Sequence, residues 1–310
     1  MEDRQLAIAA DLKDLGANDW LAEIDEICEE FGFFEQLGMG HCAGFLDAGN
    51  HLLVPFESAE AVREHNIDAE PRGFAYARHD GWSHLALISF TESWFRDEAV
   101  YAFFDRLVDE EFFGDFSQIV FYGGDGGAAY AAAAFSVAAP GATVIALRPQ
   151  ATLDAGTAGW DPRYKAARLN DFTGRYGYAP EMIEAADKVF VAYDPHQRFD
   201  AVHAALFRKP HVTLLPCPLF GDALDRAFDR MWIQDIMIKL AMDYALDKKR
   251  FLQLLRARRY DQTYARTLVR QLIMTNHPRL ARVVCEYMLR RGENAFFEQK
   301  LAELNASDDG

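Results

Sequence analysis

The residues with the clearest chemical potential lie in a glycine-rich turn, residues 123–127, which reads Gly-Gly-Asp-Gly-Gly. An apolar run at 118–122 precedes this turn and an alanine-rich stretch at 128–139 follows it, which predicts a strand, a tight turn and a helix. Such a turn displays its central side chain, and neighbours without a Cβ let the strand and the helix approach closely. Asp125 is therefore a candidate carboxylate nucleophile, or alternatively a cap for the helix behind it.

Two further aspartates come after later apolar runs. Asp194 ends the strand predicted at 188–193, and Asp222 lies beyond the run at 211–215. With Asp125 they make three candidate catalytic positions, in the chain order of a nucleophile, an acid and a base. A covalent intermediate on a carboxylate needs a histidine-activated water for its breakdown. An aspartate at the last position cannot easily replace that histidine, because clustered carboxylates repel and raise one another's pKa.

Other residues near the turn are candidates for ligand binding. Gly124 and Gly126 flank Asp125 at the start of a helix, where backbone N–H groups are available to a ligand. Arg148, Asp154 and Trp160 follow the strand predicted at 142–147, the end of a parallel strand at which α/β sheets bind ligands. A salt-bridged surface loop is the alternative interpretation of these three residues. We expect neither a metal nor another cofactor, because no Cys/His cluster has ligand spacing and the turn has no Gly-Lys-Ser/Thr ending.

The surrounding pattern alternates strand and helix from residue 52 to residue 215, which predicts a doubly wound, mostly parallel α/β sheet. Pro55 assigns the strand at 52–56 to an edge or an end of that sheet. The first forty residues have a helical pattern. From residue 224 onward only helical patterns remain, so we expect an α/β domain at 1–236 and a helical C-terminal appendage at 237–305.

The net charge of −16 is unevenly distributed along the chain. Residues 1–238 are strongly acidic and residues 239–300 are basic. An acidic body repels nucleic acid, so we expect no nucleic-acid partner, and we expect the basic appendage to pack on the acidic domain or on a second copy in a homodimer. No apolar run is long enough to span a membrane. Four cysteines without paired spacing and an N-terminus without a signal pattern favour a cytoplasmic protein with reduced thiols.

The turn at 123–127 resembles the nucleophile elbow of the α/β-hydrolases, with Asp125 in the place of the usual serine. By order of elements the resemblance covers residues 50–222. It implies Asp194 as the acid of a degenerate triad and Asp222 in place of the histidine. Some members of the family, the haloalkane dehalogenases and epoxide hydrolases, do use an aspartate at the elbow.

The chain is also similar to a bacterial group often labelled phosphoadenosine phosphosulfate reductase. The similar sequence segments are residues 121–124, 131–141 and 149–154. The label implies a sulfonucleotide reductase, which uses a Ser-Gly-Gly phosphate loop and a C-terminal Glu-Cys-Gly motif. Cys285 stands instead in Val-Cys-Glu-Tyr, within a helical pattern.

Three functional hypotheses follow. The first is a degenerate, non-hydrolytic α/β-hydrolase-like protein that binds a small molecule or a protein partner. The second is an active hydrolase with Asp125 as covalent nucleophile, which requires a histidine within hydrogen-bond reach of its carboxylate. The third is the reductase of the label, which requires a reactive thiol near a basic, phosphate-sized pocket.

Overall fold

The computed structural model describes residue 8 and residues 11–306. Its centre is an eight-stranded sheet with the order β1-β2-β4-β3-β5-β6-β7-β8. β2 runs antiparallel to both of its neighbours, and the remaining pairs are parallel. The strands are β1 (Gly32–Leu37), β2 (His41–Leu46), β3 (His51–Ser58), β4 (Ser83–Ser89), β5 (Gln118–Gly123), β6 (Thr143–Leu147), β7 (Lys188–Tyr193) and β8 (Val212–Pro216).

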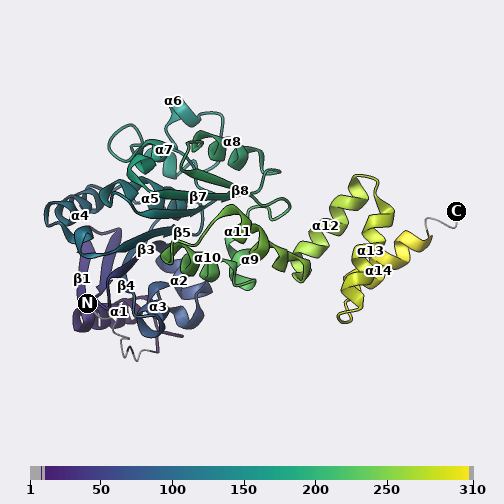
Figure 1. The fold of residues 1–310 in the computed structure, drawn as a ribbon, viewed down its shortest axis with the longest axis horizontal. Helices are drawn as coiled ribbons and strands as arrows, with labels where there is room; N and C mark the ends of the chain where they lie inside the picture. The colour runs from purple at the N-terminus through teal and green to yellow at the C-terminus, as the bar shows by residue number, and fades with distance from the viewer. Residues whose placement is uncertain (1–7, 9–10, 307–310) are drawn as a thin grey trace.

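Helices cover both faces of this sheet, as Figure 1 shows. The α-helices are α1 (Ala17–Phe31), α2 (Ala59–His65), α3 (Gly73–His79), α4 (Glu98–Asp109), α5 (Gly126–Phe135), α6 (Ala155–Ala158), α7 (Ala179–Met182), α8 (Arg198–Leu206), α9 (Leu224–Arg230), α10 (Ile233–Met242), α11 (Lys248–Leu254), α12 (Gln262–Met274), α13 (Pro278–Leu289) and α14 (Ala295–Ala306). Short 3-10 turns are η1 (Ile67–Ala69), η2 (Phe112–Asp115), η3 (Ser136–Ala138), η4 (Ala167–Leu169), η5 (Ile183–Ala185) and η6 (Leu255–Arg259).

The unit that the sequence predicts best is β5, α5 and β6. All residues of β5 and β6 are buried, as expected of strands covered on both faces. The small side chains of α5 let it pack close to the sheet, and Phe135 at its end stacks on Phe104 and Phe56. The predicted doubly wound, mostly parallel sheet is confirmed.

Two local predictions are wrong. The helical pattern of the first forty residues ends at Phe31, and β1 and β2 then form an antiparallel hairpin. The strand with Pro55 is central rather than peripheral, since β3 lies between β4 and β5. Pro55 is tolerated there because the β3–β4 pairing skips residues 54 and 55, so no partner on β4 needs its missing N–H.

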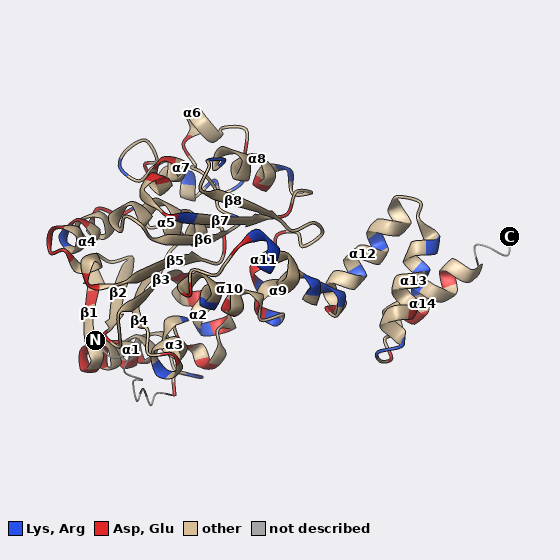
Figure 2. Cartoon of the chain, in the orientation of Figure 1, with Lys and Arg blue, Asp and Glu red and all other residues tan. Residues whose placement is uncertain are grey.

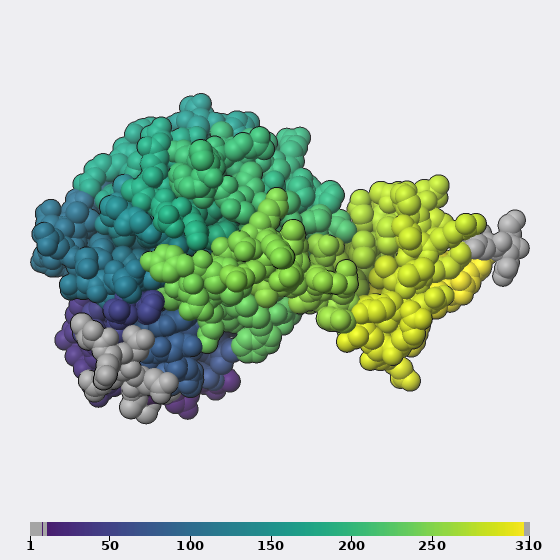
Figure 3. Space-filling model, viewed as in Figure 1, coloured from purple at the N-terminus to yellow at the C-terminus, as the bar shows by residue number. Residues whose placement is uncertain are grey.

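The C-terminal helices divide into two groups. Apolar residues of α9, α10 and α11 pack against the sheet in one shared core that extends to Leu255. In contrast, α12, α13 and α14 have a small core of their own and stand away from the sheet (Figures 1 and 3). The predicted boundary at residues 236 and 237 falls inside α10, and the change of core comes later, between η6 and α12.

The charges follow the same division. Figure 2 shows Asp and Glu positions spread over the sheet domain and many Lys and Arg positions along α11, α12 and α13. Within the part of the chain that the structure describes, no helix is both long and apolar enough to cross a membrane.

Candidate functional site

The structure places Asp125 between the end of β5 and the start of α5, as the glycine pattern predicts. Its backbone is extended, with φ −156° and ψ 169°, so it lacks the strained conformation expected of an elbow nucleophile. Its carbonyl accepts a hydrogen bond from the N–H of Ala129 at 2.6 Å, but its carboxylate caps none of the first N–H groups of α5. The helix therefore begins with N–H groups that no side chain satisfies.

Two glycines of the turn are required by close packing. A Cβ on Gly123 would lie 2.3 Å from the carbonyl oxygen of Ala128, so only glycine lets β5 and α5 meet at this distance. A Cβ on Gly127 would lie 3.2 Å from the indole of Trp94, which packs over the start of α5. The glycine pattern of the sequence is therefore explained by a close approach of strand β5 and helix α5.

The environment of Asp125 favours its protonated form more than water does. Its side chain is exposed at the surface of a depression, yet surrounding protein and the nearby Asp225 raise the pKa of its carboxyl group. Arg148 and Arg226 act in the opposite direction without cancelling that effect. Within the described residues, no histidine forms a hydrogen bond or ion pair with this carboxylate.

Asp125 opens on a cleft of about 450 Å³ at the carboxyl ends of the central strands. One wall is the start of α5, the other is the loop after β4, and Arg148 and Tyr164 close the end. The lining includes four aromatic side chains and three carboxylates, namely Phe90, Trp94, Phe95, Tyr164, Glu60, Glu92 and Asp125. On its other side Asp125 lines a smaller cavity of about 90 Å³ together with His65.

The other two aspartates of the predicted triad have structural partners. Asp194 is buried and accepts hydrogen bonds from the backbone N–H of His196 at 2.9 Å and of Gly221 at 2.7 Å. The ring Nδ1 of His196 lies 3.2 Å from the same carboxylate. Asp222 is exposed and contributes its backbone carbonyl, not its carboxylate, to Arg148.

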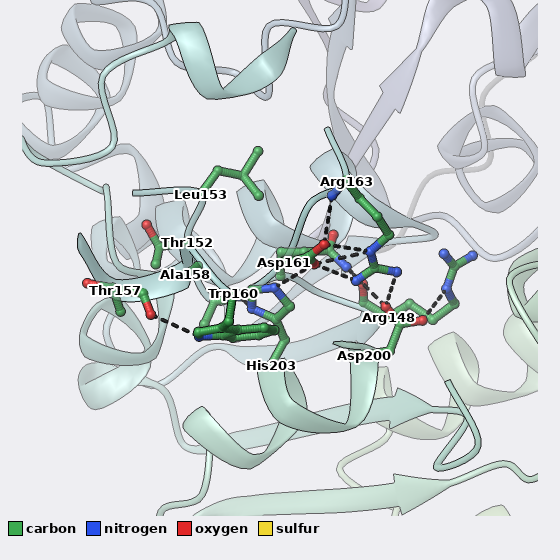
Figure 4. Close-up of polar contacts among 12 residues, drawn as sticks. Arg148, Thr152, Leu153, Thr157, Ala158, Trp160, Asp161, Arg163, Asp200 and His203 are labelled. Atoms are coloured by element: carbon green, nitrogen blue, oxygen red, sulfur yellow. Dashed lines mark hydrogen bonds and ion pairs between the residues drawn. The ribbon is translucent and has the colours of Figure 1, made fainter. Parts of the chain in front are cut away.

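Arg148 is held by a buried ionic network, shown in Figure 4. Its Nε donates to Asp200 at 3.1 Å, and Asp200 also pairs with Arg163 at 2.7 Å. Arg163 makes a second, two-pronged contact with Asp161, which holds the pKa of that carboxyl group below its usual value although burial opposes this. The guanidinium of Arg148 is thereby fixed beside the cleft.

His203 completes the network. Its Nδ1 accepts the N–H of Ala151 at 3.1 Å and its Nε2 faces Asp161 at 3.2 Å, so a neutral ring with the proton on Nε2 fits both contacts. Burial lowers the pKa of His203 to about 4 although Asp161 opposes the shift. This histidine is therefore a structural one.

Asp154 and Trp160 belong to the loop beside this network rather than to the lining of the cleft. Asp154 caps the short helix α6 by accepting the N–H of Thr157 at 2.9 Å. Trp160 donates its indole N–H to the carbonyl of Thr157 at 3.0 Å and lies against His203, with ring centroids 4.6 Å apart (Figure 4). Of the five candidate ligand residues, Gly126 and Arg148 line the larger cleft and Gly124 lines the smaller cavity.

Sequence reasoning missed Gln150, which lies close to Gly126 together with Tyr164. A Cβ on Gly126 would lie 3.6 Å from Oε1 of Gln150 and 3.8 Å from the hydroxyl of Tyr164. Oε1 of Gln150 is buried without a hydrogen-bond partner, while its amide nitrogen donates to the carbonyl of Arg148 at 3.1 Å. Gln150 comes soon after the end of β6 at Leu147, and the rule that ligands bind beyond the ends of parallel strands could have identified it.

The thiols do not form a reactive site. Cys28, Cys42, Cys217 and Cys285 are all buried and free. Burial raises the pKa of each, to about 12 for Cys42, which disfavours the nucleophilic thiolate. Among the described residues, no three His, Cys, Asp or Glu side chains gather as metal ligands.

A scan against protein-family models gives no match, and a search of curated proteins gives none either. Solved structures similar to this chain include an esterase from Pyrobaculum calidifontis, with 11% identity, a TM-score of 0.42 and coverage of 76% of this chain and 95% of that one. The capsule O-acetyltransferase of Neisseria meningitidis serogroup A has 11% identity and a TM-score of 0.40, over 65% of this chain and 93% of that one.

A chain of the glycosylation-associated protein complex from Streptococcus agalactiae has 15% identity and a TM-score of 0.44, over 66% of this chain. The match spans only 45% of that Streptococcus chain. At these identities and scores, the similarities carry no argument about activity. The fold class rests on the sheet itself: the chain is α/β-hydrolase-like, with an elbow turn after β5 and helices at its C-terminus.

Proposed function

We propose that this protein is a degenerate α/β-hydrolase-like protein whose elbow binds a small polar molecule and does not use Asp125 as a nucleophile. The observation that carries the proposal is the state of the Asp125 side chain. It stands at an open cleft without strain and without a histidine bonded to it, and its pKa is raised. Without a histidine to activate water, an ester on this carboxylate would not be broken down, whereas the carboxylate is a good acceptor for a ligand's hydroxyl or ammonium group.

The charge of the cleft indicates the class of ligand. Its carboxylates Glu60, Glu92 and Asp125 face a single cation, Arg148, which is already paired with Asp200. An anionic ligand would be repelled, whereas a neutral or cationic one would find acceptors. The aromatic part of the lining favours a ligand that also has an apolar face.

A second candidate function is hydrolysis through an ester on Asp125. It is favoured by one observation, that His65 and Asp125 line the same small cavity. The reductase hypothesis has less support, because every thiol is buried with a raised pKa.

The preferred charge of the ligand can be tested with three sugars that share one ring and differ in charge. We expect millimolar glucosamine to raise the melting temperature most, glucose less, and glucuronate not at all. The effect should disappear in Asp125→Asn and persist in Asp222→Asn, a matched change of an exposed aspartate outside the cleft lining. A larger shift with glucuronate than with glucosamine would contradict the proposed acidic site.

The non-nucleophilic role of Asp125 has its own test. Haloalkane and epoxide substrates should not be turned over, and mass spectrometry should find no adduct on the peptide that contains Asp125. A trapped ester that is lost in Asp125→Asn would revive the hydrolase candidate. Accumulation of that adduct in His65→Gln, with turnover lost, would identify His65 as the base that activates water for its breakdown.

The proposal also includes a cellular compartment and an oligomeric state. Four free, buried cysteines are consistent with a reducing compartment, and we place the protein in the cytoplasm on that basis. We also propose a homodimer that involves the C-terminal helices. Its support is the apolar surface that these helices expose, together with the opposite charge of the basic C-terminal segment and the acidic body.

A further inference from the structure

A second group of polar side chains lies outside the elbow, where β2 meets the end of β4. The register pairs His41 with Ser89, so the imidazole of His41 lies under the loop that follows β4. Nε2 of His41 is 2.5 Å from Oγ of Ser93. Nδ1 of the same ring faces Oδ2 of Asp97 at 3.7 Å. The imidazole of His41 therefore lies between the hydroxyl of Ser93 and the carboxylate of Asp97, although the three residues are far apart along the chain or on different elements.

The hydrogen bonds around Ser93 show where its proton points. Ser89 donates its own hydroxyl proton to the carbonyl of Thr91 at 2.5 Å, and the N–H of Phe95 donates to Oγ of Ser93 at 3.2 Å. The hydroxyl of Ser93 can then donate to Ser89 at 3.2 Å or to His41 at 2.5 Å, and the shorter contact favours His41. His41 thus acts as the acceptor.

The protonation state of His41 agrees with this direction. The ring is almost fully buried, and burial lowers the pKa of His41 although Asp97 opposes the shift. A neutral ring with its proton on Nδ1, toward Asp97, leaves Nε2 free to accept from Ser93. Asp97 is itself oriented, because its other oxygen caps α4 by accepting the N–H of Ala99 at 2.9 Å. The His41–Asp97 separation is longer than a hydrogen bond, as is common for catalytic pairs before substrate binds.

The loop that carries Ser93 is strained and borders the cleft, although Ser93 itself is half-buried and is not one of the lining residues. Trp94 and Phe95, directly after it, both have left-handed backbones, with φ of 58° and 57°. Two consecutive bulky residues in this region store energy that ordinary loops avoid, and such strain concentrates at functional sites. Both residues line the 450 Å³ cleft, and Gly126 and Gly127 at the start of α5 line it too. Uncapped N–H groups at a helix start are suited to a developing oxyanion.

We propose that Ser93, His41 and Asp97 form a nucleophilic site that takes an acyl group from an ester or thioester bound against Trp94 and Phe95 at the edge of this cleft. Oγ of Ser93 bonds to the acyl carbon while its proton passes to Nε2 of His41. The bond from the acyl carbon to the leaving alcohol or thiol then breaks, and that group takes the proton from His41. Water or a second hydroxyl compound removes the acyl group from Ser93 by the reverse sequence.

A fluorophosphonate reagent tests the proposal on the full-length protein. Oγ of Ser93 should bond to phosphorus as the P–F bond breaks, and mass spectrometry should place the single adduct on Ser93. Ser93→Ala should abolish labelling. His41→Gln should slow it at least about 100-fold and Asp97→Asn at least about 10-fold, the scale on which general bases and their orienting acids act. Ser89→Ala, a matched change of the neighbouring hydroxyl, should still be labelled at Ser93.

A folding defect in the His41 variant would not obscure the result, because the pH profile of the unmodified protein gives a second measurement. The labelling rate should stay high at pH 6 and fall only below the lowered pKa of His41. No adduct, or an adduct equally strong in Ser93→Ala, would overturn the proposal. Labelling should persist in Asp222→Asn, and ligand binding at the elbow is measured by melting temperature, so the two sites can fail separately.

Discussion

The carboxylate of Asp125 is subject to two opposing influences. Its position at the start of α5 favours the charged form through the helix dipole, whereas burial by the surrounding protein and the neighbouring Asp225 disfavour it. Desolvation by the surrounding protein atoms prevails although the side chain reaches the surface, because the pKa of Asp125 is raised. The folded chain then holds this proton at pH values where the unfolded chain has lost it, so stability falls as pH rises through that window.

The residue-scale prediction concerns Asp125→Asn. Removal of the charge should raise the melting temperature at pH 7 by about 1–2 °C, and this gain should shrink toward pH 4, where the wild-type carboxyl is also protonated. Thermal denaturation followed by circular dichroism across pH 4–7 measures it, with Asp222→Asn as the exposed control. A less stable variant at pH 7 would mean that the helix dipole outweighs burial.

The sequence predicts a contact of the site more readily when the two contacting residues are close together along the chain. The turn around Asp125 could be predicted because its glycines and its helix are local. Arg148 could be named, but its ionic partner Asp200 lies 52 residues further along the chain. The contact between His41 and Ser93 likewise spans 52 residues and depends on a strand register that no local pattern encodes.

At the scale of the element, the crossing of β5 and α5 depends on one missing Cβ. Gly123→Ala should destabilise the protein by at least about 3 kcal/mol, because the new methyl group would meet the backbone of Ala128 and cannot move aside. Gly114→Ala is the matched control, since a Cβ there meets nothing within 4 Å. Urea denaturation of both variants tests the difference, and equal stabilities would show that the crossing tolerates a shift.

The ionic network of Figure 4 connects the loop after β6 to helix α8, which follows β7. Arg163→Met should cost about 3–5 kcal/mol of unfolding free energy, because it leaves Asp161 and Asp200 as buried charges without that partner. Arg175→Met, which breaks the exposed pair with Asp105, should cost no more than about 1 kcal/mol. Similar losses in both variants, measured by chemical denaturation, would contradict a stabilising role for burial of the network.

The same scale explains which elements the sequence predicts. β5, β6 and β7 are apolar runs bounded by turns, and burial on both faces produces that pattern. β1 has only one fully buried residue, so its composition does not separate it from the helix before it. Tertiary pairing with β2, not local propensity, decides its structure.

For the whole molecule, the two groups of C-terminal helices have different relations to the sheet. α10 and α11 complete a core that includes residues of β5, β6 and β7. α12, α13 and α14 project from the body (Figure 3) and touch it near the junction, where Arg230 pairs with Asp261 at 3.3 Å. They expose apolar side chains that their own core leaves uncovered, namely Ile273, Met274, Leu280 and Val283. We propose that this exposed apolar surface is the dimer interface.

Two truncations separate these roles. A chain ending at Ile238 loses buried core residues such as Met242 and Phe251, so it should expose the sheet face and aggregate. A chain ending at Tyr260 keeps that core and should stay folded, with the near-native melting temperature of the sheet domain. The chain that ends at Tyr260 lacks the exposed apolar side chains of α12 and α13, so it should be a monomer. The full chain should be a dimer. Sedimentation velocity at several concentrations measures both states. A monomeric full-length chain, or a dimer that survives removal of residues 261–310, would show that these helices do not join two copies.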